Sequence, residues 1–99
     1  MTTHSPPELL EDAAATFRER NTTYGNNYKR AGRLLLALFP DDHIPAISTA
    51  EEALRLSLIL SCLTKLQRYA HCFTAGGHQD SAHDLMVYAA MLEEATNEN

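Results

Sequence analysis

The chain has 99 residues, of which 44% are hydrophobic and 21% are charged, and its formal net charge is −5 at pH 7. This composition is ordinary for a globular protein and argues against extended disorder, and the length predicts a single domain over residues 1–99 with flexible ends at 1–5 and 96–99. The acidic balance argues against a nucleic-acid partner, because such proteins normally carry a basic surplus. A chain this short builds only a modest core, so we expect a homo-oligomer.

The N-terminus shows no charged-then-apolar leader, and the apolar run from Leu56 to Leu63 is much shorter than the roughly 20 residues of a membrane span. We therefore expect a cytoplasmic protein without a membrane partner. Cys62 and Cys72 fall ten residues apart on one predicted helix, a separation of about 15 Å, so they cannot form a disulfide with each other.

The first half of the chain predicts two helices. Ser5-Pro6-Pro7-Glu8 is typical of a helix start, and this helix runs to about Arg20 with Leu10, Ala13, Ala14 and Phe17 on its apolar face. Weak helix formers and a glycine at 21–26 then predict a bend. A second helix follows at about 27–39, is stopped by Pro40 and leads into a loop at 40–47.

The second half predicts a long helix and a shorter one. Ser48-Thr49-Ala50-Glu51-Glu52 offers two overlapping capping boxes, and the helix that they start runs to Phe73 or Thr74, before Gly76-Gly77. A fourth helix runs from Gln79 or Asp80 to about Ala95. No stretch alternates as a strand does. The sequence therefore predicts an all-α fold, a four-helix bundle with a long third helix and a C-terminal antiparallel helical hairpin.

Two opposite stripes run along the third helix. One is apolar and is the predicted core face; its members are Leu56, Leu60, Leu63, Leu66, Ala70 and Phe73. The other stripe changes from apolar to basic residues along the helix and comprises Leu54, Leu58, Ser61, Lys65, Arg68 and Cys72. The fourth helix has a stripe of its own, which begins with two acids and comprises Asp80, Asp84, Val87 and Met91.

An antiparallel hairpin would set Lys65 level with Asp84 and Arg68 level with Asp80. The four charges form either a structural salt-bridge network or a polar pocket in which cations bind phosphate and carboxylates bind a metal or a sugar hydroxyl.

The bend Asn21-Thr22-Thr23-Tyr24-Gly25, the pair Lys65-x-x-Arg68 and the segment Asp80-x-x-x-Asp84-Leu85-x-x-Tyr88-Ala89, in this order, resemble the MazG-like relatives of the all-α NTP pyrophosphatases that occur in phages and prophages. The resemblance covers roughly Phe17 to Leu92. It implies a bundle, usually oligomeric, whose polar groove binds a phosphorylated nucleotide, and a protein that acts in a bacterial host cell.

The chain departs from the active pyrophosphatases that it resembles. Those enzymes hold magnesium with an E-x-x-E pair on one helix and an E-x-x-D pair on the next. Here Asp84 matches the last acid, but Ser81 stands three residues before it, and the groove positions of the preceding helix are Lys65 and Arg68. Metal-assisted cleavage of a phosphoanhydride usually needs several carboxylates, whereas Arg and Lys suit an anionic ligand.

Three functional hypotheses follow. The leading one is a phage-type protein that captures a phosphorylated nucleotide or nucleotide-derived signal, sequesters it from host defence, and needs no cofactor for binding; the ligand-binding residues would be Tyr24, Lys65, Arg68, Asp80 and Asp84. The alternative is a pyrophosphohydrolase whose Mg²⁺ is held by Asp80 and Asp84. The third is a non-catalytic, oligomeric interaction protein in which the four charges lock the helix register.

Other residues carry weaker signals. Tyr28 and Tyr69 could stack on a base, although aromatics at helical spacing are more often core. His78 and His83 are five residues apart, which is not a standard zinc spacing, so a histidine at this helix start is expected to bond to backbone or water. The group Lys29-Arg30-Arg33 is interpreted as a solvated face or as the rim of a pocket.

Overall fold

The computed structural model describes residues 4–97, and the side chains of 23, 24 and 97 are outside the description. This part of the chain is all-α, as predicted, and contains no strand. Its elements in order are α1 (Pro6–Tyr24), the 3-10 helix η1 (Asn27–Arg30), α2 (Ala31–Ala37), η2 (Pro40–Asp42), α3 (Ala50–His71), η3 (Phe73–Ala75) and α4 (Gln79–Asn97). No helix of residues 4–97 is both long and apolar enough to cross a membrane.

Helix α1 begins where the sequence predicts and ends later. Ser5 is its N-cap residue, and prolines occupy its first positions, where a missing N–H costs nothing. The helix continues beyond Arg20 to Tyr24 and ends at Gly25, whose φ of 65° a glycine adopts without penalty and whose N–H donates to the Asn21 carbonyl. The glycine, and not the weak helix formers before it, therefore decides where α1 stops.

The start of α3 confirms the predicted capping box and selects Thr49 as the N-cap residue. Thr49 Oγ1 accepts a hydrogen bond from the Glu52 N–H at 3.1 Å and donates to Glu52 Oε1 at 2.9 Å. The Ser48 hydroxyl donates to the same Oε1 at 3.2 Å. The bond from Thr49 and those from Ser48 hold the pKa of Glu52 below its ordinary value of 4.5.

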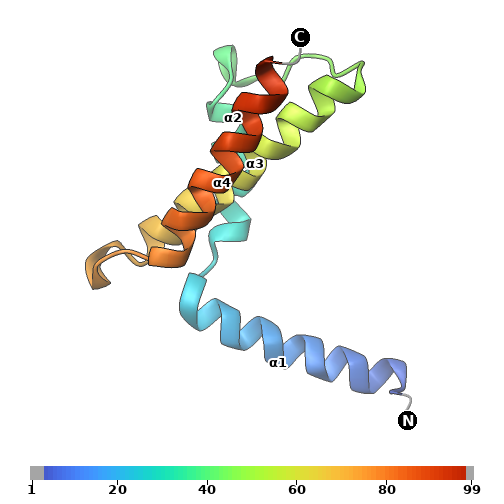
Figure 1. Ribbon diagram of the computed structural model, residues 1–99. Coiled ribbons are helices and arrows are strands. Elements are labelled where there is room, and N and C mark those ends of the chain that lie inside the picture. The colour runs from blue at the N-terminus through green and yellow to red at the C-terminus, as the bar shows by residue number, and fades with distance from the viewer. Residues whose placement is uncertain (1–3, 98–99) are drawn as a thin grey trace.

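Two glycines make the turn between α3 and α4. Gly76 (φ 100°) and Gly77 (φ 93°) both have left-handed backbone, and the Gly77 N–H donates to the Cys72 carbonyl at 2.8 Å. Gly77 also lies directly under the Tyr69 ring, since a Cβ at this position would be 2.6 Å from Tyr69 Cζ. The chain returns antiparallel along α3, and the predicted helical hairpin is confirmed (Figure 1).

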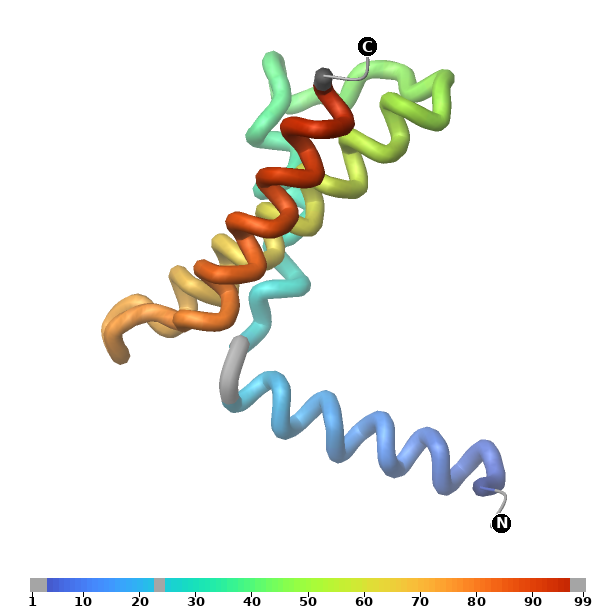
Figure 2. The backbone as a smooth tube through the Cα atoms, viewed as in Figure 1, coloured from blue at the N-terminus to red at the C-terminus, as the bar shows by residue number. Residues whose placement is uncertain are grey.

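The arrangement of the helices leaves α1 apart from the others. Helices α3 and α4 lie side by side, and α2 packs on α3, whereas α1 extends away from all three (Figures 1 and 2). The radius of gyration is 16.9 Å, while a compact chain of this length has about 13 Å. The protein is therefore an elongated molecule with one projecting helix.

The predicted core stripe of α3 is only partly buried, which corrects the sequence-based expectation. Leu63 is buried, but Leu60, Leu66 and Phe73 are 41%, 52% and 71% exposed. The physical reason is that α2, with seven residues, is too short to cover a helix of 22 residues, and α1 does not lie against it. Burial instead concentrates at Leu58, Leu63, Gln67, Ser81 and Ala95, along the contacts of α3 with α4 and with η1 and α2.

A pair of amides fastens η1 to α3. Asn27 Nδ2 donates to the Gln67 carbonyl at 2.9 Å, and Gln67 Nε2 donates to the Asn27 carbonyl at 2.8 Å. The two residues are 40 positions apart in the chain, and Gln67 is buried. This reciprocal pair sets the position of the bend that connects α1 to the hairpin.

The capping box predicts a pH dependence that Glu52→Gln removes. Because the pKa of Glu52 is lowered in the folded protein, its contribution to stability is present above 4.5 and is lost as pH falls through the lowered value. We expect Glu52→Gln to melt below the wild type at pH 7 and the difference to shrink as pH falls to about 3. Thermal unfolding of both proteins across this range measures it, with Glu51→Gln as the matched first-turn control that leaves the hydrogen bonds between Thr49 and Glu52 in place.

The turn predicts that Gly77→Ala costs more than Gly76→Ala. Both glycines have positive φ, so a Cβ at either costs about 1–2 kcal/mol, but only at Gly77 does it also collide with the Tyr69 ring. Around Gly76, no heavy atom of the described residues other than those of the glycine and its two chain neighbours lies within 4 Å of the new Cβ. Urea denaturation of the two variants gives the comparison, and equal losses would show that the Tyr69 contact is unimportant.

Candidate functional site

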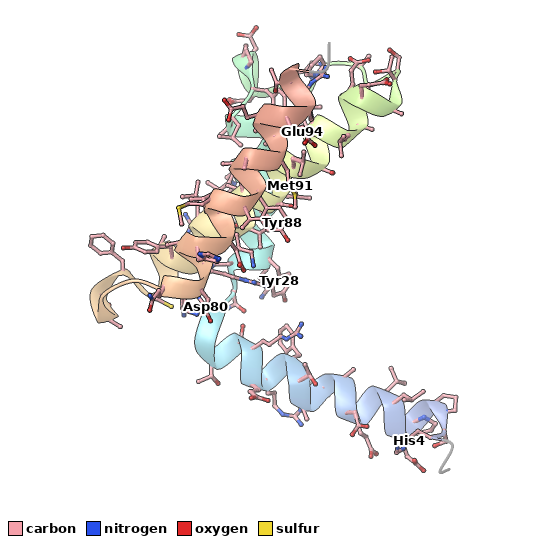
Figure 3. All side chains as sticks on the ribbon, in the orientation of Figure 1. His4, Tyr28, Asp80, Tyr88, Met91 and Glu94 are labelled. Carbon is pink, nitrogen blue, oxygen red and sulfur yellow. The ribbon has the colours of Figure 1, made fainter. Side chains whose placement is uncertain are left out.

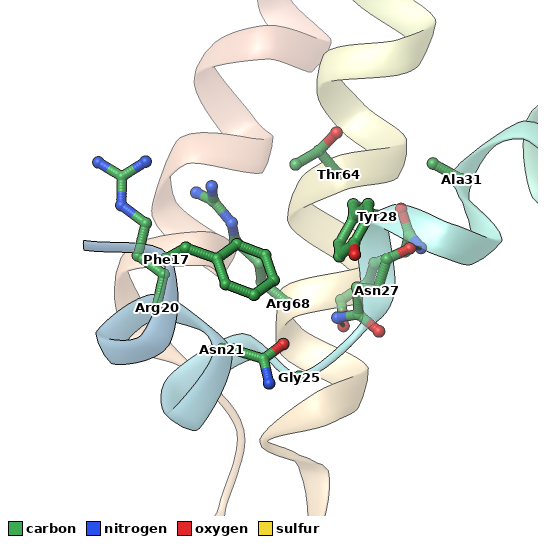
Figure 4. A pocket seen from close by; sticks show the side chains of 10 residues that line it. Phe17, Arg20, Asn21, Gly25, Asn27, Tyr28, Ala31, Thr64 and Arg68 are labelled. Carbon is green, nitrogen blue, oxygen red and sulfur yellow. Dashed lines mark hydrogen bonds between the residues drawn. The ribbon is translucent and has the colours of Figure 1, made fainter. Parts of the chain in front are cut away.

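A cavity of about 460 Å³ lies where the end of α1, η1 and α3 meet (Figure 4). Its volume is in the range of small-molecule sites, which span about 300–1,000 Å³. Its lining combines two cations, two aromatic rings and several amides: Phe17, Arg20, Asn21, Gly25, Asn27, Tyr28, Ala31, Thr64, Gln67 and Arg68.

The aromatic side of the cavity joins α1 to η1. The rings of Phe17 and Tyr28 pack edge to face, with centroids 5.9 Å apart and planes at 78°. Lys29 Nζ lies 5.9 Å from the centroid of the Tyr28 ring, which places a third positive charge near this side. Both rings are largely exposed, so they present apolar surface on which a flat heterocycle could stack.

The amide side of the cavity contains a buried polar atom for which the described residues provide no partner. The side-chain oxygen of Asn21 is buried and makes no hydrogen bond to another described residue, whereas the nearby amides of Asn27 and Gln67 bond each other's backbone. A buried polar atom without a partner costs about 1–3 kcal/mol. A ligand that hydrogen-bonds to this amide would recover that cost.

The two cations of the cavity come from different helices. Arg20 is near the end of α1, and Arg68 is in the last turns of α3, so the bend between them brings the two guanidinium-bearing side chains to one cavity. Guanidinium groups bind phosphate through paired N–H donors. The cavity thus combines cationic, aromatic and amide groups, which suits an anionic ligand with a flat ring.

The seam between α3 and α4 contains one of the two predicted ion pairs. Lys65 Nζ lies 3.0 Å from Asp84 Oδ2, which confirms the predicted register. For the second pair, Asp80 is exposed and makes no ion pair within the described residues. Asp80 instead lies in the first turn of α4, where the helix dipole favours a negative charge.

Of the five predicted ligand-binding residues, not all line this cavity. Arg68 lines the cavity, whereas Lys65, Asp80 and Asp84 lie outside its lining. The side chain of Tyr24 lies outside the described residues, although its neighbour Gly25 is part of the wall.

His78 and Ser81 form hydrogen bonds that cap the start of α4. The Ser81 N–H donates to His78 Nδ1 at 3.3 Å, and the Ser81 hydroxyl lies 2.6 Å from the same nitrogen. Nδ1 is therefore an acceptor that caps the helix, and the expected hydrogen bond between a histidine and the backbone is confirmed. Ser81, at the position where the resembling enzymes have an acid, is buried in this cap.

The metal residues of the pyrophosphohydrolase alternative do not form a cage by themselves. Within residues 4–97, no three His, Cys, Asp or Glu side chains gather closely enough to hold a metal ion. The carboxylate of Asp84 is also engaged by Lys65. A Mg²⁺ site at Asp80 and Asp84 thus stays a prediction that needs further ligands from another chain or from a bound nucleotide.

Sequence reasoning missed most of the cavity lining. Phe17 was assigned to a core face, and Arg20, Asn21, Asn27 and Gln67 were not singled out. The available signal was the bend itself, because a polar segment between two helices, flanked by Arg20 and followed by Asn27, marks a place where several side chains converge. Gln67 is a polar residue between Lys65 and Arg68 whose burial depends on its contact with η1.

Comparisons of the chain with models of known families, with curated proteins and with solved structures found no match.

The Lys65–Asp84 pair predicts a small coupling energy. The Lys65 side chain is 14% exposed but that of Asp84 is 45% exposed, so solvent screens the pair and the expected coupling is about 1 kcal/mol or less. A double-mutant cycle with Lys65→Met and Asp84→Asn, followed by urea denaturation at low and high salt, measures it. A coupling of about 3 kcal/mol would instead indicate a buried ion pair.

Proposed function

We propose that this protein binds a phosphorylated nucleotide or nucleotide-derived signal in the cavity between α1, η1 and α3. The observation that carries the proposal is the convergence of Arg20 and Arg68 with an aromatic pair and an unpartnered amide in one cavity. The arginines would bind the phosphates, and the exposed rings of Phe17 and Tyr28 would contact the base. The Asn21 amide would hydrogen-bond to the base or the sugar.

Capture without turnover fits this chemistry better than hydrolysis does. Cleavage of a phosphoanhydride by metal-activated water needs carboxylates close to the phosphates. Among the described residues, no Asp or Glu lines the cavity, and the two acids of the hydrolase alternative lie outside that lining. Sequestration of a nucleotide signal in a bacterial host, as the MazG-like resemblance suggests, remains the use that we propose for such capture.

A thermal-shift screen tests binding and turnover together. The purified protein is heated with nucleoside mono-, di- and triphosphates, cyclic nucleotides and ADP-ribose, each with and without Mg²⁺, and every stabilising sample is then separated by chromatography. A ligand at about 100 times its dissociation constant adds about 2.7 kcal/mol to the folded state. Recovery of the unchanged ligand supports capture, whereas a cleaved product that forms only with Mg²⁺ would establish the pyrophosphohydrolase.

Ligand binding in the cavity and ligand binding at the α3–α4 seam would be affected by different mutations. We expect Arg20→Ala and Arg68→Ala each to raise the dissociation constant of the best ligand by at least about 10-fold, because each removes a charge-assisted hydrogen bond to phosphate. Lys65→Ala is the matched control, since Lys65 is on the same helix as Arg68, is bonded to Asp84 and does not line the cavity.

Isothermal titration calorimetry of the three variants with one ligand gives the comparison. Lys65→Ala should change the dissociation constant less than about threefold. If Lys65→Ala abolishes binding while Arg20→Ala does not, the ligand binds at the seam between α3 and α4 and the proposed cavity is wrong.

A further inference from the structure

Helix α1 presents an apolar stripe that is exposed over most of its length within the described residues. Leu10, Ala14 and Phe17 are spaced three or four residues apart on one face, and every side chain from Pro6 to Arg20 is exposed, although the Phe17 ring contacts Tyr28. An isolated helix of this length is only marginally stable in water, because most helical stability comes from packing of the apolar face. The apolar face of α1 is therefore available for packing against another molecule.

A second apolar surface lies between α2 and α3. A cavity of about 300 Å³ is lined there by Leu34, Leu63, Leu66 and Ala70, with Arg30 and His71 at its polar edge. Leu66 is 52% exposed although it belongs to the predicted core stripe. We call this cavity the α2–α3 groove.

The two surfaces are complementary in charge as well as in polarity. The first turns of α1 contain Glu8, Glu11 and Asp12, whereas the segment beside the groove contains Lys29, Arg30 and Arg33. An amphipathic helix that places its apolar face in a groove with a basic edge is a common mode of recognition.

The chain exposes more surface than a compact monomer of its mass, and the excess is large enough to form a stable dimer interface. The chain exposes 7659 Å², while a compact monomer of 11.0 kDa exposes about 5,600 Å². The excess of about 2,000 Å² per chain exceeds the roughly 800 Å² per partner of an ordinary interface and fits an obligate homodimer.

We propose that the protein is an obligate homodimer in which α1 of each protomer docks into the α2–α3 groove of its partner. Leu10 and Ala14 would pack on Leu66, and the acidic turns of α1 would face Arg30. Within one chain α1 is directed away from the hairpin, so a second copy provides the complementary groove (Figures 1 and 3).

The dimer also completes the ligand cavity. Phe17, Arg20 and Asn21 are all on α1, and Asn27 and Gln67 line both the ligand cavity and the groove. Docking of α1 on the partner would hold one wall of the ligand cavity in place. Self-association itself does not rest on the proposed function, because it is measured without any nucleotide.

Size-exclusion chromatography with light scattering tests the dimer on the full-length chain. The wild type should have twice the mass of the 11.0 kDa chain at micromolar concentration. Leu10→Asp in α1 and Leu66→Asp in the groove should each raise the dissociation constant at least about 100-fold. Leu38→Asp is the matched control, because Leu38 is 58% exposed at the end of α2 and outside the groove lining, and it should leave the dimer intact.

Mixing the two monomeric variants distinguishes α1-in-groove docking from other dimers. A heterodimer of Leu10→Asp with Leu66→Asp contains one undamaged contact, in which the normal α1 of one variant meets the normal groove of the other, so the mixture should dimerise more tightly than either variant alone. Circular dichroism should show that both variants keep a folded hairpin and lose helix only to the extent of α1.

Three results would overturn the proposal. A monomeric wild type would show that no second copy covers α1. Loss of the dimer in Leu38→Asp as well would show a nonspecific association, and two monomeric variants that fail to complement each other would indicate contacts between like surfaces, α1 with α1 or groove with groove.

Discussion

The reciprocal amide pair of Asn27 and Gln67 is the constraint on which the rest of the structure depends. Its two hydrogen bonds join segments 40 residues apart and are protected by the burial of Gln67. A chain with so few buried apolar side chains gains little direction from its core, so a polar contact of defined geometry sets where η1 lies on α3. The ligand cavity and the α2–α3 groove share this pair as a common wall. A displacement of Gln67 therefore changes the shape of both cavities.

The hairpin and the bend have separate physical roles. The hairpin is held in register by the Lys65–Asp84 pair, the histidine cap of α4 and the two glycines of the turn. These contacts occupy the carboxylate of Asp84 and bury Ser81, so the side of α3 that faces α4 is used for structure. Arg68, near the end of α3, borders the cavity on the side of α1, and this placement moves the proposed anion site from the seam to the bend.

The projecting helix links the two proposals. In one chain α1 contributes three residues to the ligand cavity but has most of its length in solvent. If α1 docks on a partner, the energy of association also orders the wall that carries Phe17, Arg20 and Asn21. Ligand binding and self-association would then be coupled, because each favours the same position of α1.

The sequence by itself determined the local structure of this protein. The capping box within Ser48–Glu52, the glycine turn, the four helices and the antiparallel pairing of Lys65 with Asp84 all follow from interactions between residues close in the chain or from helical periodicity. Only the tertiary structure decided what each face contacts. Periodicity shows that Leu66 and Phe73 share an apolar stripe, but their exposure depends on the length of α2 and the direction of α1. In the same way, Arg20, Asn27 and Gln67 became site residues through contacts across the bend, and no local pattern encodes such contacts.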